Sequence, residues 1–477
     1  MTGLFLLGPL LGREGDAPTS LAAAALVILA GNPFAVASIS FQLSFASVAG
    51  LLLATPRIHR TLTALWPAQS RWSMALRSFA AGSAAASLGA LLFTAPLSAL
   101  YFHHLSLVSP LANLLVLWEA PFLFGSALLL TPLSMALPFL TPLLALPEVL
   151  ARYLLTVSGA LARLPGHAVY FTGAHMTAWL VFCYLLLVVC LLSRQRRRKY
   201  AVAAALMVLG LGTSRSLPGL ALQDSPLTMV AVDVGQGAAT LLHSGEETVL
   251  VDCGSLYSLL GPGALVTDTM LSYGWDRVDR MVLTHYHEDH AGGLGELLAR
   301  MEIRELVLPQ LSGSDDQGAL QAEVLSLAAR YDVPVTYVEE PRTVAMGEAA
   351  LTVYPPLTQG DVNEEGLTIL CTAGDFDVLI TGDMGSSTER LLVETYDLPD
   401  IEVLVVGHHG SKYATTEELL KTVTPEIGVI SVGENNFGHP TAEAMDRMAW
   451  QGMTLYRTDL QGNIVIQVEE TAEAERG

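Results

Sequence analysis

Long apolar runs cover most of the first 218 residues and do not recur in the rest of the chain. Four of them are about as long as the roughly 20 residues that a helix needs to cross a bilayer. A soluble core helix is seldom apolar on every face. The first part therefore predicts an all-α, multi-spanning membrane domain, with spans near Phe79–Tyr101, Val108–Leu130, Ser134–Leu150 and Thr177–Leu192.

The apolar region Leu21–Pro56 is too long for a single span. Asn32-Pro33 interrupts it, so it forms either two spans or a broken, re-entrant pair. Its second part also carries polar residues, which either satisfy neighbouring helix backbones or line a polar path. Those polar residues are Ser40, Gln42 and Ser44.

Two basic loops predict the orientation of the spans. Cytoplasmic loops carry an excess of Lys and Arg, and the four spans between the two loops are an even number, so both loops fit the cytoplasm. The short apolar run Tyr200–Leu211 would then lead outward and leave the second half outside the cytoplasmic (inner) membrane. The basic residues are Arg57, Arg60, Arg71 and Arg77 in one loop and Arg194, Arg196, Arg197, Arg198 and Lys199 in the other.

The two halves also differ in charge. Residues 1–218 hold 13 basic and 4 acidic side chains, a net charge of +9, whereas residues 219–477 hold 12 and 42, a net charge of −30. This balance argues against a protein that wraps DNA in basic charge. We expect a membrane domain at 1–214, a linker at 215–226, a soluble domain at 227–470 and an acidic tail at 471–477. The four cysteines predict buried thiols and no disulfide framework; they are Cys183, Cys190, Cys253 and Cys371.

The second half alternates strand-like runs with turns and helical segments, which predicts an α/β sandwich with sheets inside and helices outside. The expected strands are Thr228–Val234, Thr248–Cys253, Arg280–Thr284, Val378–Thr381, Val403–Val406 and Ile427–Val432. The expected helices are Ala264–Tyr273, Leu294–Met301, Ala319–Tyr331 and Ala442–Trp450.

Chemistry-bearing residues follow the third of these strands. Arg280–Thr284 runs into His285-Tyr286-His287-Glu288-Asp289-His290. In an extended segment residues 285 and 287 point the same way, and the turn into the next helix brings Asp289 and His290 to an adjacent point. Three imidazoles and a carboxylate are costly to bury without a cation. We therefore predict two metal ions side by side in preference to a solvated loop.

Other strand ends offer further ligands. Asp383 ends one buried strand, and a second leads to His408 and His409, of which one would complete the metal site and the other would face the substrate. The sequence leaves open which does which. A third strand leads to Asn435, Asn436 and His439.

These motifs resemble the metallo-β-lactamase fold and, together with the membrane half, the ComEC-type DNA-internalisation competence proteins. The resemblance covers nearly the whole chain. It departs from the family at Ala238, where an acidic residue is common, and in lacking the amino-terminal soluble domain and first helices, so we expect an N-terminal part to be missing. No histidine lies between His290 and His408, and Asn363 lies where many superfamily members have one. Such a shift towards oxygen ligands favours manganese over zinc.

The resemblance implies a membrane channel for single-stranded DNA and an outer nuclease domain that degrades the other strand with two divalent ions. Other DNA-uptake proteins and membrane lipid are its implied partners. As ligands we expect His285, His287, Asp289, His290 and Asp383, with Asp252 orienting a ligand imidazole or ending a strand in a turn. The DNA phosphate would be held by Ser411, Lys412, Asn436 and His439, with Asp289, Lys412 and His439 catalytic. Arg457 makes either a substrate contact or a structural salt bridge.

Two other function classes stay open. The outer domain either hydrolyses another phosphodiester, or the chain is a DNA conduit with a non-catalytic metal site. The charge of the second half repels DNA at ordinary salt, so we hypothesise a salt-adapted exterior, because the Debye length falls to about 3 Å at 1 M salt. Equal stability of this domain at low and high salt would contradict that hypothesis.

Overall fold

The computed structural model describes residues 16–66, 70–102, 104–162, 164, 166–170, 174–192, 202–203, 205–213, 225–258, 260–310 and 318–469. The chain divides into two compact units, residues 1–196 and 197–477. The predicted acidic tail, the basic residues 194–199 and nearly all of the predicted linker lie outside the described residues, as does part of the run Tyr200–Leu211.

The described part of the first unit is helical apart from the short strand pair β1 (His104–Ser106) and β2 (Ala168–Tyr170). Side-chain caps fix three of its helix starts: Asp16, Asn32 and Ser38 each accept a hydrogen bond from a backbone N–H of the first turn. Its α-helices are α2 (Ala17–Gly31), α3 (Ile39–Leu53), α4 (Thr55–Leu65), α5 (Arg71–Phe102), α6 (Ser109–Val116), α7 (Ala120–Ala136), α8 (Ala145–Ala162) and α9 (Ala174–Leu192), with 3-10 helices η1 (Pro33–Ala37) and η2 (Pro138–Leu144).

Among the described residues of the first unit, two helical segments are long and apolar enough to cross a membrane: α5, and Pro138–Ala162, which joins η2 to α8. Two bent pairs would raise the number to four: α3 with α4, bent by 48°, and α6 with α7, bent by 47°. The predicted span Ser134–Leu150 is wrong in its bounds. Its helix breaks at Leu137, because the proline that follows disfavours helical backbone at that residue.

Small residues let α3 and α5 approach closely. A Cβ atom added to Gly50 would lie 2.2 Å from the backbone oxygen of Gly89, and one added to Gly89 would lie 2.4 Å from Oγ1 of Thr55. Such contacts between small residues are typical of helices packed in membranes. The buried residues of α5 are accordingly small: Ala81, Ala85, Ser87, Gly89, Ala95 and Ala99.

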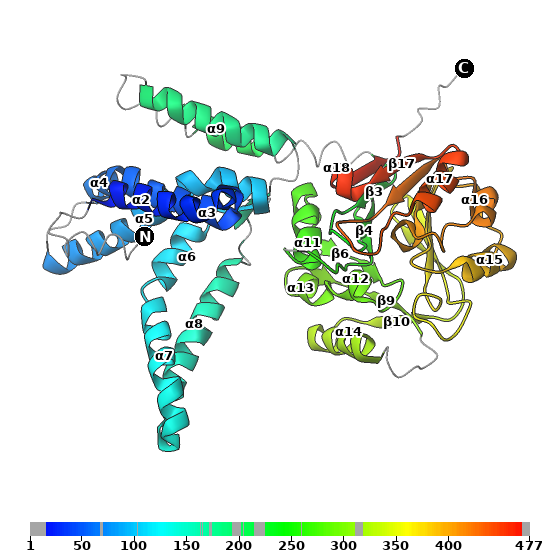
Figure 1. The fold of residues 1–477 in the computed structure, drawn as a ribbon, viewed down its shortest axis with the longest axis horizontal. Helices are drawn as coiled ribbons and strands as arrows, with labels where there is room; N and C mark the ends of the chain where they lie inside the picture. The colour runs from blue at the N-terminus through cyan, green and yellow to red at the C-terminus, as the bar shows by residue number, and fades with distance from the viewer. Residues whose placement is uncertain are drawn as a thin grey trace. The chain divides into compact units, whose positions relative to one another are not determined.

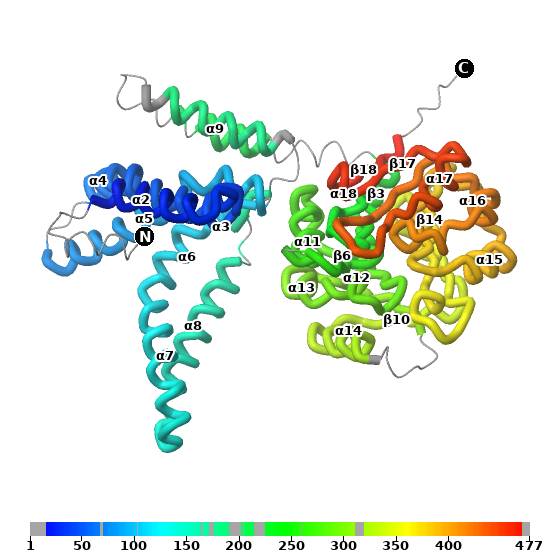
Figure 2. The backbone as a smooth tube through the Cα atoms, viewed as in Figure 1, coloured from blue at the N-terminus to red at the C-terminus, as the bar shows by residue number. Residues whose placement is uncertain are grey.

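The second unit is built on two seven-stranded sheets. The first has the order β10 (Val335–Val338), β9 (Leu306–Pro309), β7 (Arg280–Val282), β5 (Glu247–Val251), β4 (Thr240–Ser244), β3 (Thr228–Ala231), β18 (Ile464–Gln467). The second has the order β11 (Arg342–Met346), β12 (Ala349–Tyr354), β13 (Thr368–Ala373), β14 (Phe376–Ile380), β15 (Val403–Val405), β16 (Ile427–Ile430), β17 (Thr454–Arg457). The chain path through them can be followed in Figure 2.

Three apolar clusters hold the second unit in four layers, helices outside and sheets inside, as the sequence predicted (Figure 1). Val249 and Val251 of β5 face the second sheet, whereas Leu250 between them faces the helices on the outer side. Helices on that side are α11 (Pro262–Tyr273), α13 (Leu294–Leu298) and α14 (Gly318–Tyr331). The other side carries α15 (Ser386–Thr395), α16 (Glu417–Val423) and α17 (Ala442–Trp450).

Strands in the structure end earlier than the sequence predicted. Strand β7 ends at Val282, because the backbone N–H of Thr284 donates to the Asp252 carboxylate rather than to a neighbouring strand. The chain is therefore free to turn at the site. Cys253 and Cys371 are buried thiols, but Cys183 of α9 is only half-buried, which corrects that prediction. The side chain of Cys190 lies outside the described residues.

Candidate metal centre

A buried carboxylate orients the first group of histidines. Oδ1 of Asp252 accepts from the backbone N–H of Thr284 at 2.7 Å, and Oδ2 accepts from the Thr284 hydroxyl at 2.7 Å and from Nδ1 of His290 at 2.8 Å. Because the Thr284 hydroxyl donates to Asp252, its oxygen accepts from Nδ1 of His285 at 3.0 Å. Both rings therefore carry a proton on Nδ1 and turn Nε2 towards the site.

The one-turn helix α12 (Glu288–Ala291) completes this loop and brings Asp289 and His290 back beside His285. The ring centres of His285 and His290 lie 4.1 Å apart, and those of His285 and His287 lie 4.9 Å apart. His285 and His290 are buried, whereas His287 is exposed. The three imidazoles of the sequence motif thus lie together, with His287 on the solvent side.

The second sheet supplies the facing residues. Asp383 follows β14, and His408 and His409 follow β15 in the turn η3 (Gly407–Gly410). Both histidines have positive φ, at 51° and 54°. Nδ1 of His409 donates to the backbone oxygen of Ser431 at 2.8 Å, so this ring also turns Nε2 inward.

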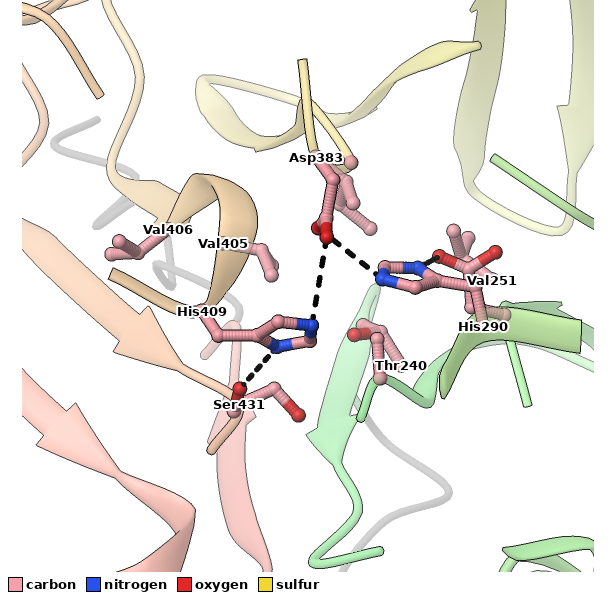
Figure 3. A pocket seen from close by; sticks show the side chains of 12 residues that line it. Thr240, Val251, His290, Asp383, Val405, Val406, His409 and Ser431 are labelled. Carbon is pink, nitrogen blue, oxygen red and sulfur yellow. Dashed lines mark hydrogen bonds and ion pairs between the residues drawn. The ribbon is translucent and has the colours of Figure 1, made fainter. Parts of the chain in front are cut away.

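Four side chains from the two sheets converge: Asp289, His290, Asp383 and His409 have one candidate ligand atom each within 4.8 Å of one another. Nε2 of His290 lies 3.2 Å from Oδ1 of Asp383, and Nε2 of His409 lies 3.4 Å from Oδ2 of Asp289. Figure 3 shows the His290 and His409 rings pointing towards Asp383. The sequence left the roles of His408 and His409 open. His409 is buried in this group, whereas His408 is 29% exposed with Nε2 3.7 Å from Asp383.

Charge in the site is shared between carboxylates and imidazoles. Burial raises the pKa of Asp383, but His290 and His409 outweigh it and hold that pKa well below its usual value; for Asp289 the same opposition leaves a pKa of about 2. Burial lowers the pKa of His290 and His409, yet Asp383 and the other nearby carboxylates raise both. His285 differs, because burial and the neighbouring His290 lower its pKa.

The donor set fits divalent cations. Nε2 of His285, His290 and His409 is buried and makes no hydrogen bond of good geometry within the described part of the chain. Buried polar atoms left without partners are costly, and three imidazole nitrogens beside two carboxylates are ligands that zinc and manganese accept. A bound cation would take the place of protons on Nε2 of His290 and His409.

The predicted phosphate-binding residues lie further out. Lys412 and Asn436 are exposed, and Ser411 is buried. His439 is half-buried, with its ring centre 5.6 Å from that of His408, and burial together with that histidine lowers its pKa.

Arg457 is held by Asp459, with N–O distances of 3.0 and 2.6 Å. The sequence left two interpretations of Arg457 open, a substrate contact and a structural salt bridge. The structure contains the salt bridge, and the substrate contact is not tested.

Two residues of the site were not predicted. Thr284 joins Asp252 to His285, and Ser431 holds His409 through its backbone oxygen while its hydroxyl donates to the backbone oxygen of Gly237 at 2.9 Å. Thr284 is the last residue of the predicted strand Arg280–Thr284, and Ser431 lies near the end of the predicted strand Ile427–Val432; this position at a strand end was the only signal in the sequence. A backbone acceptor leaves no trace in residue type, so Ser431 could not have been found from its side chain.

Comparison with known proteins matches both units to families. Residues 1–197 match the competence protein family, and residues 232–434 match the metallo-beta-lactamase superfamily. ComE operon protein 3 of Bacillus subtilis is 25% identical over 490 residues, 97% of this chain and 60% of that protein. Competence protein ComA of Neisseria gonorrhoeae is 28% identical over 446 residues, 91% of this chain and 56% of that protein. The metallo-beta-lactamase fold protein YhfI from Bacillus subtilis is 14% identical, with a TM-score of 0.36 over 50% of this chain and 99% of that one.

Residues 1–197 are thus similar to the competence protein family and residues 232–434 to the metallo-beta-lactamase superfamily. This domain order is that of the ComEC-type competence proteins, so the resemblance predicted from the sequence is confirmed. The chain spans less than two thirds of the length of the two competence relatives.

Proposed function

We propose that the second unit is a binuclear, metal-dependent phosphodiester hydrolase that cuts DNA, and that the chain serves DNA uptake during natural transformation. The observation that carries this proposal is the convergence of two imidazoles and two carboxylates from the two sheets, with the buried ring of His285 beside that of His290, in a chain whose first part is similar to the competence family. The similarity to ComE operon protein 3 of Bacillus subtilis and to competence protein ComA of Neisseria gonorrhoeae supports competence as the process.

The ligands fall into two groups. We infer that Asp289, His290, Asp383 and His409 would hold one divalent ion and that His285 and His287, beside this group, would hold a second, manganese or zinc. Such ions supply a water of lowered pKa and stabilise the charge that develops on the phosphoryl oxygens.

Other residues of the site would orient the ligand imidazoles or hold the DNA phosphates. Asp252, Thr284 and Ser431 fix the ring nitrogens that face the site, a task whose loss typically costs about 10- to 100-fold in metal affinity or activity. From the rim, Lys412, Asn436 and His439 contact the DNA phosphates, with Ser411 behind them. Because Arg457 is engaged by Asp459, it is left out of this proposed contact set.

The first unit is proposed to conduct one DNA strand through the cytoplasmic membrane while the hydrolase unit, on the outer face, degrades the other. The apolar helices and the bent helix pairs support a membrane path. The two basic loops support the orientation. Membrane lipid and further DNA-uptake proteins would be its partners.

Hydrolysis of a labelled single-stranded oligonucleotide by the full chain in detergent, with manganese added, tests the proposal. We expect cleavage that a chelator abolishes and that Asp289→Ala lowers at least ~100-fold, because this carboxylate faces His409 at the centre of the group. Glu288→Ala is the matched control, since Glu288 is the exposed neighbouring carboxylate on α12, and it should cleave at the normal rate.

Two results would replace the proposal. Cleavage of small phosphodiesters without cleavage of DNA would establish a membrane-tethered hydrolase of another substrate. DNA uptake that survives Asp289→Ala in cells would establish a conduit whose metal site is not catalytic.

A further inference from the structure

An exposed phenylalanine lies beside the proposed metal centre. The Phe437 side chain is 56% exposed, and its ring centre lies 6.0 Å from that of His439. The His439 ring in turn lies 5.6 Å from that of His408, whose Nε2 is 3.7 Å from Asp383. A row of rings therefore leads from the ligand group to solvent and ends at Phe437.

The loop that carries Phe437 is held rigidly by one amide side chain. Oδ1 of Asn435 accepts from the backbone N–H groups of Phe437 and His439 at 3.0 and 3.1 Å. Its Nδ2 donates to the backbone oxygens of Gly433 and His439 at 2.9 and 2.8 Å. The fold thus fixes an apolar ring in water beside the site, although apolar surface is normally buried.

A second exposed ring lies on the adjacent loop. Tyr413 is 65% exposed, and Nζ of Lys412 lies 4.9 Å from the centre of its ring. Arg447 donates to the backbone oxygens of Lys412 and Ala414 at 3.3 and 2.8 Å, which fixes this turn.

The two loops are joined to each other. The backbone N–H of Thr441 donates to the backbone oxygen of Gly410 at 2.9 Å. A Cβ atom added to Gly410 would lie 2.5 Å from Cβ of Pro440. The loop of Phe437 and His439 is therefore in direct contact with the loop of His408 and Tyr413.

We propose that Phe437 and Tyr413 stack against unpaired bases of a single-stranded nucleic acid, with Lys412 on the neighbouring phosphate. This assignment rests on the proposed function, which places a phosphate of the same strand at the ligand group. Rigid aromatic faces beside a cation are the combination that binds single strands without sequence preference, since every base has a π-face. A duplex keeps its bases stacked on each other and cannot use these rings.

Binding and cleavage by the full chain in detergent test the assignment. The probes are a thymidine oligonucleotide and an abasic deoxyribose-phosphate oligomer of equal length. Phe437→Ala and Tyr413→Ala should each raise KM for the thymidine strand about 5- to 150-fold, with kcat within twofold, because a stacked base contributes about 1–3 kcal/mol. KM for the abasic oligomer should not change, and Phe437→Trp should restore the normal KM. Trp450→Ala is the control, since Trp450 is an exposed aromatic residue of α17, 87% exposed.

Fluorescence anisotropy with chelator present separates this inference from the proposed function. If the wild type cleaves neither probe, the nuclease proposal fails, yet weaker thymidine binding by Phe437→Ala alone would still support the stacking surface. Equal losses for the thymidine and abasic strands, or no loss for either, would overturn the stacking role. An effect of Trp450→Ala as large as that of Phe437→Ala would overturn it too.

Discussion

The first unit buries mainly small side chains, whereas the second buries large apolar ones. In the first, Phe34, Trp72 and Met135 are at least 80% exposed while small residues fill the helix contacts. In the second, Leu241 and Met281 are fully buried. Water drives large apolar side chains inward, whereas lipid does not, and close contacts of small residues then hold the helices together. The difference indicates that the two parts of one chain fold against two different solvents.

The two units also differ in the hydrogen bonds made by a buried carboxylate. Asp252 of the second unit accepts three hydrogen bonds from Thr284 and His290. Glu119 of the first unit is fully buried at the break between α6 and α7, and neither of its carboxylate oxygens has a hydrogen-bond partner within the described residues. In the second unit, hydrogen bonds from Thr284 and His290 thus stabilise the buried carboxylate of Asp252, and the same bonds orient His290 in the candidate metal centre.

The largest expected loss of stability comes from adding a methyl group at Gly254 of the second unit, where the packing leaves no room for it. A Cβ atom at Gly254 would lie 2.2 Å from the backbone of both Asp289 and His290. Gly254→Ala should therefore lower the free energy of unfolding of this unit by about 3 kcal/mol, the upper end of overpacking, since backbone atoms yield less than side chains. Hydrogen exchange of the full chain, followed by mass spectrometry, measures the loss of stability. Metal binding by the same variant should be lost as well.

Gly295→Ala is the matched control on α13, where the added atom would meet only Leu327 at 3.5 Å. It should leave stability within about 1 kcal/mol of the wild type. Equal losses in both variants would mean that the Gly254 contact is not what limits this unit.

A smaller effect is expected from the equivalent contact in the first unit. Gly50→Ala would place Cβ 2.2 Å from the backbone oxygen of Gly89. We expect a loss of about 2 kcal/mol, because α3 can move away from α5 in a lipid or detergent surrounding more easily than a loop inside a sandwich. Protease resistance in detergent at rising temperature reports it. Gly82→Ala, on α5 with no atom within 4 Å of the added Cβ, should behave as wild type, and an equal effect there would remove the packing explanation.

Prediction from sequence succeeded where periodicity or residue type carried the signal. The apolar runs predicted helices, and α14 and α17 match their expected ranges to within one residue. The fold class was predicted because buried strands alternate with helices. Six of the fourteen strands in the two seven-stranded sheets were predicted and the others were missed, among them β11, whose residues are mostly exposed and show no clear alternation of buried and exposed positions.

The site divides in the same way. Histidine and aspartate at strand ends could be found, because imidazole and carboxylate are metal ligands wherever they gather. The sequence could not show which of His408 and His409 joins the ligand group, since this depends on which ring reaches the backbone oxygen of Ser431. The phosphate contact predicted for Lys412 stays a prediction, and its side chain is exposed.

The smallest expected effect is a pH dependence confined to the second unit. His243 of β4 stacks on Trp275 with ring centres 4.3 Å apart, and burial lowers its pKa to about 4, although Asp279 opposes the shift. Below about pH 6.5 the unfolded chain takes up a proton that the folded one refuses, so stability should fall as the pH drops from 6.5 towards 4 and then level off. Partial exposure reduces the expected loss between pH 7 and pH 5 to about 1 kcal/mol. Denaturant unfolding followed by tryptophan fluorescence measures it. His243→Gln should flatten this part of the profile, whereas an unchanged slope in that variant would assign the dependence to other groups.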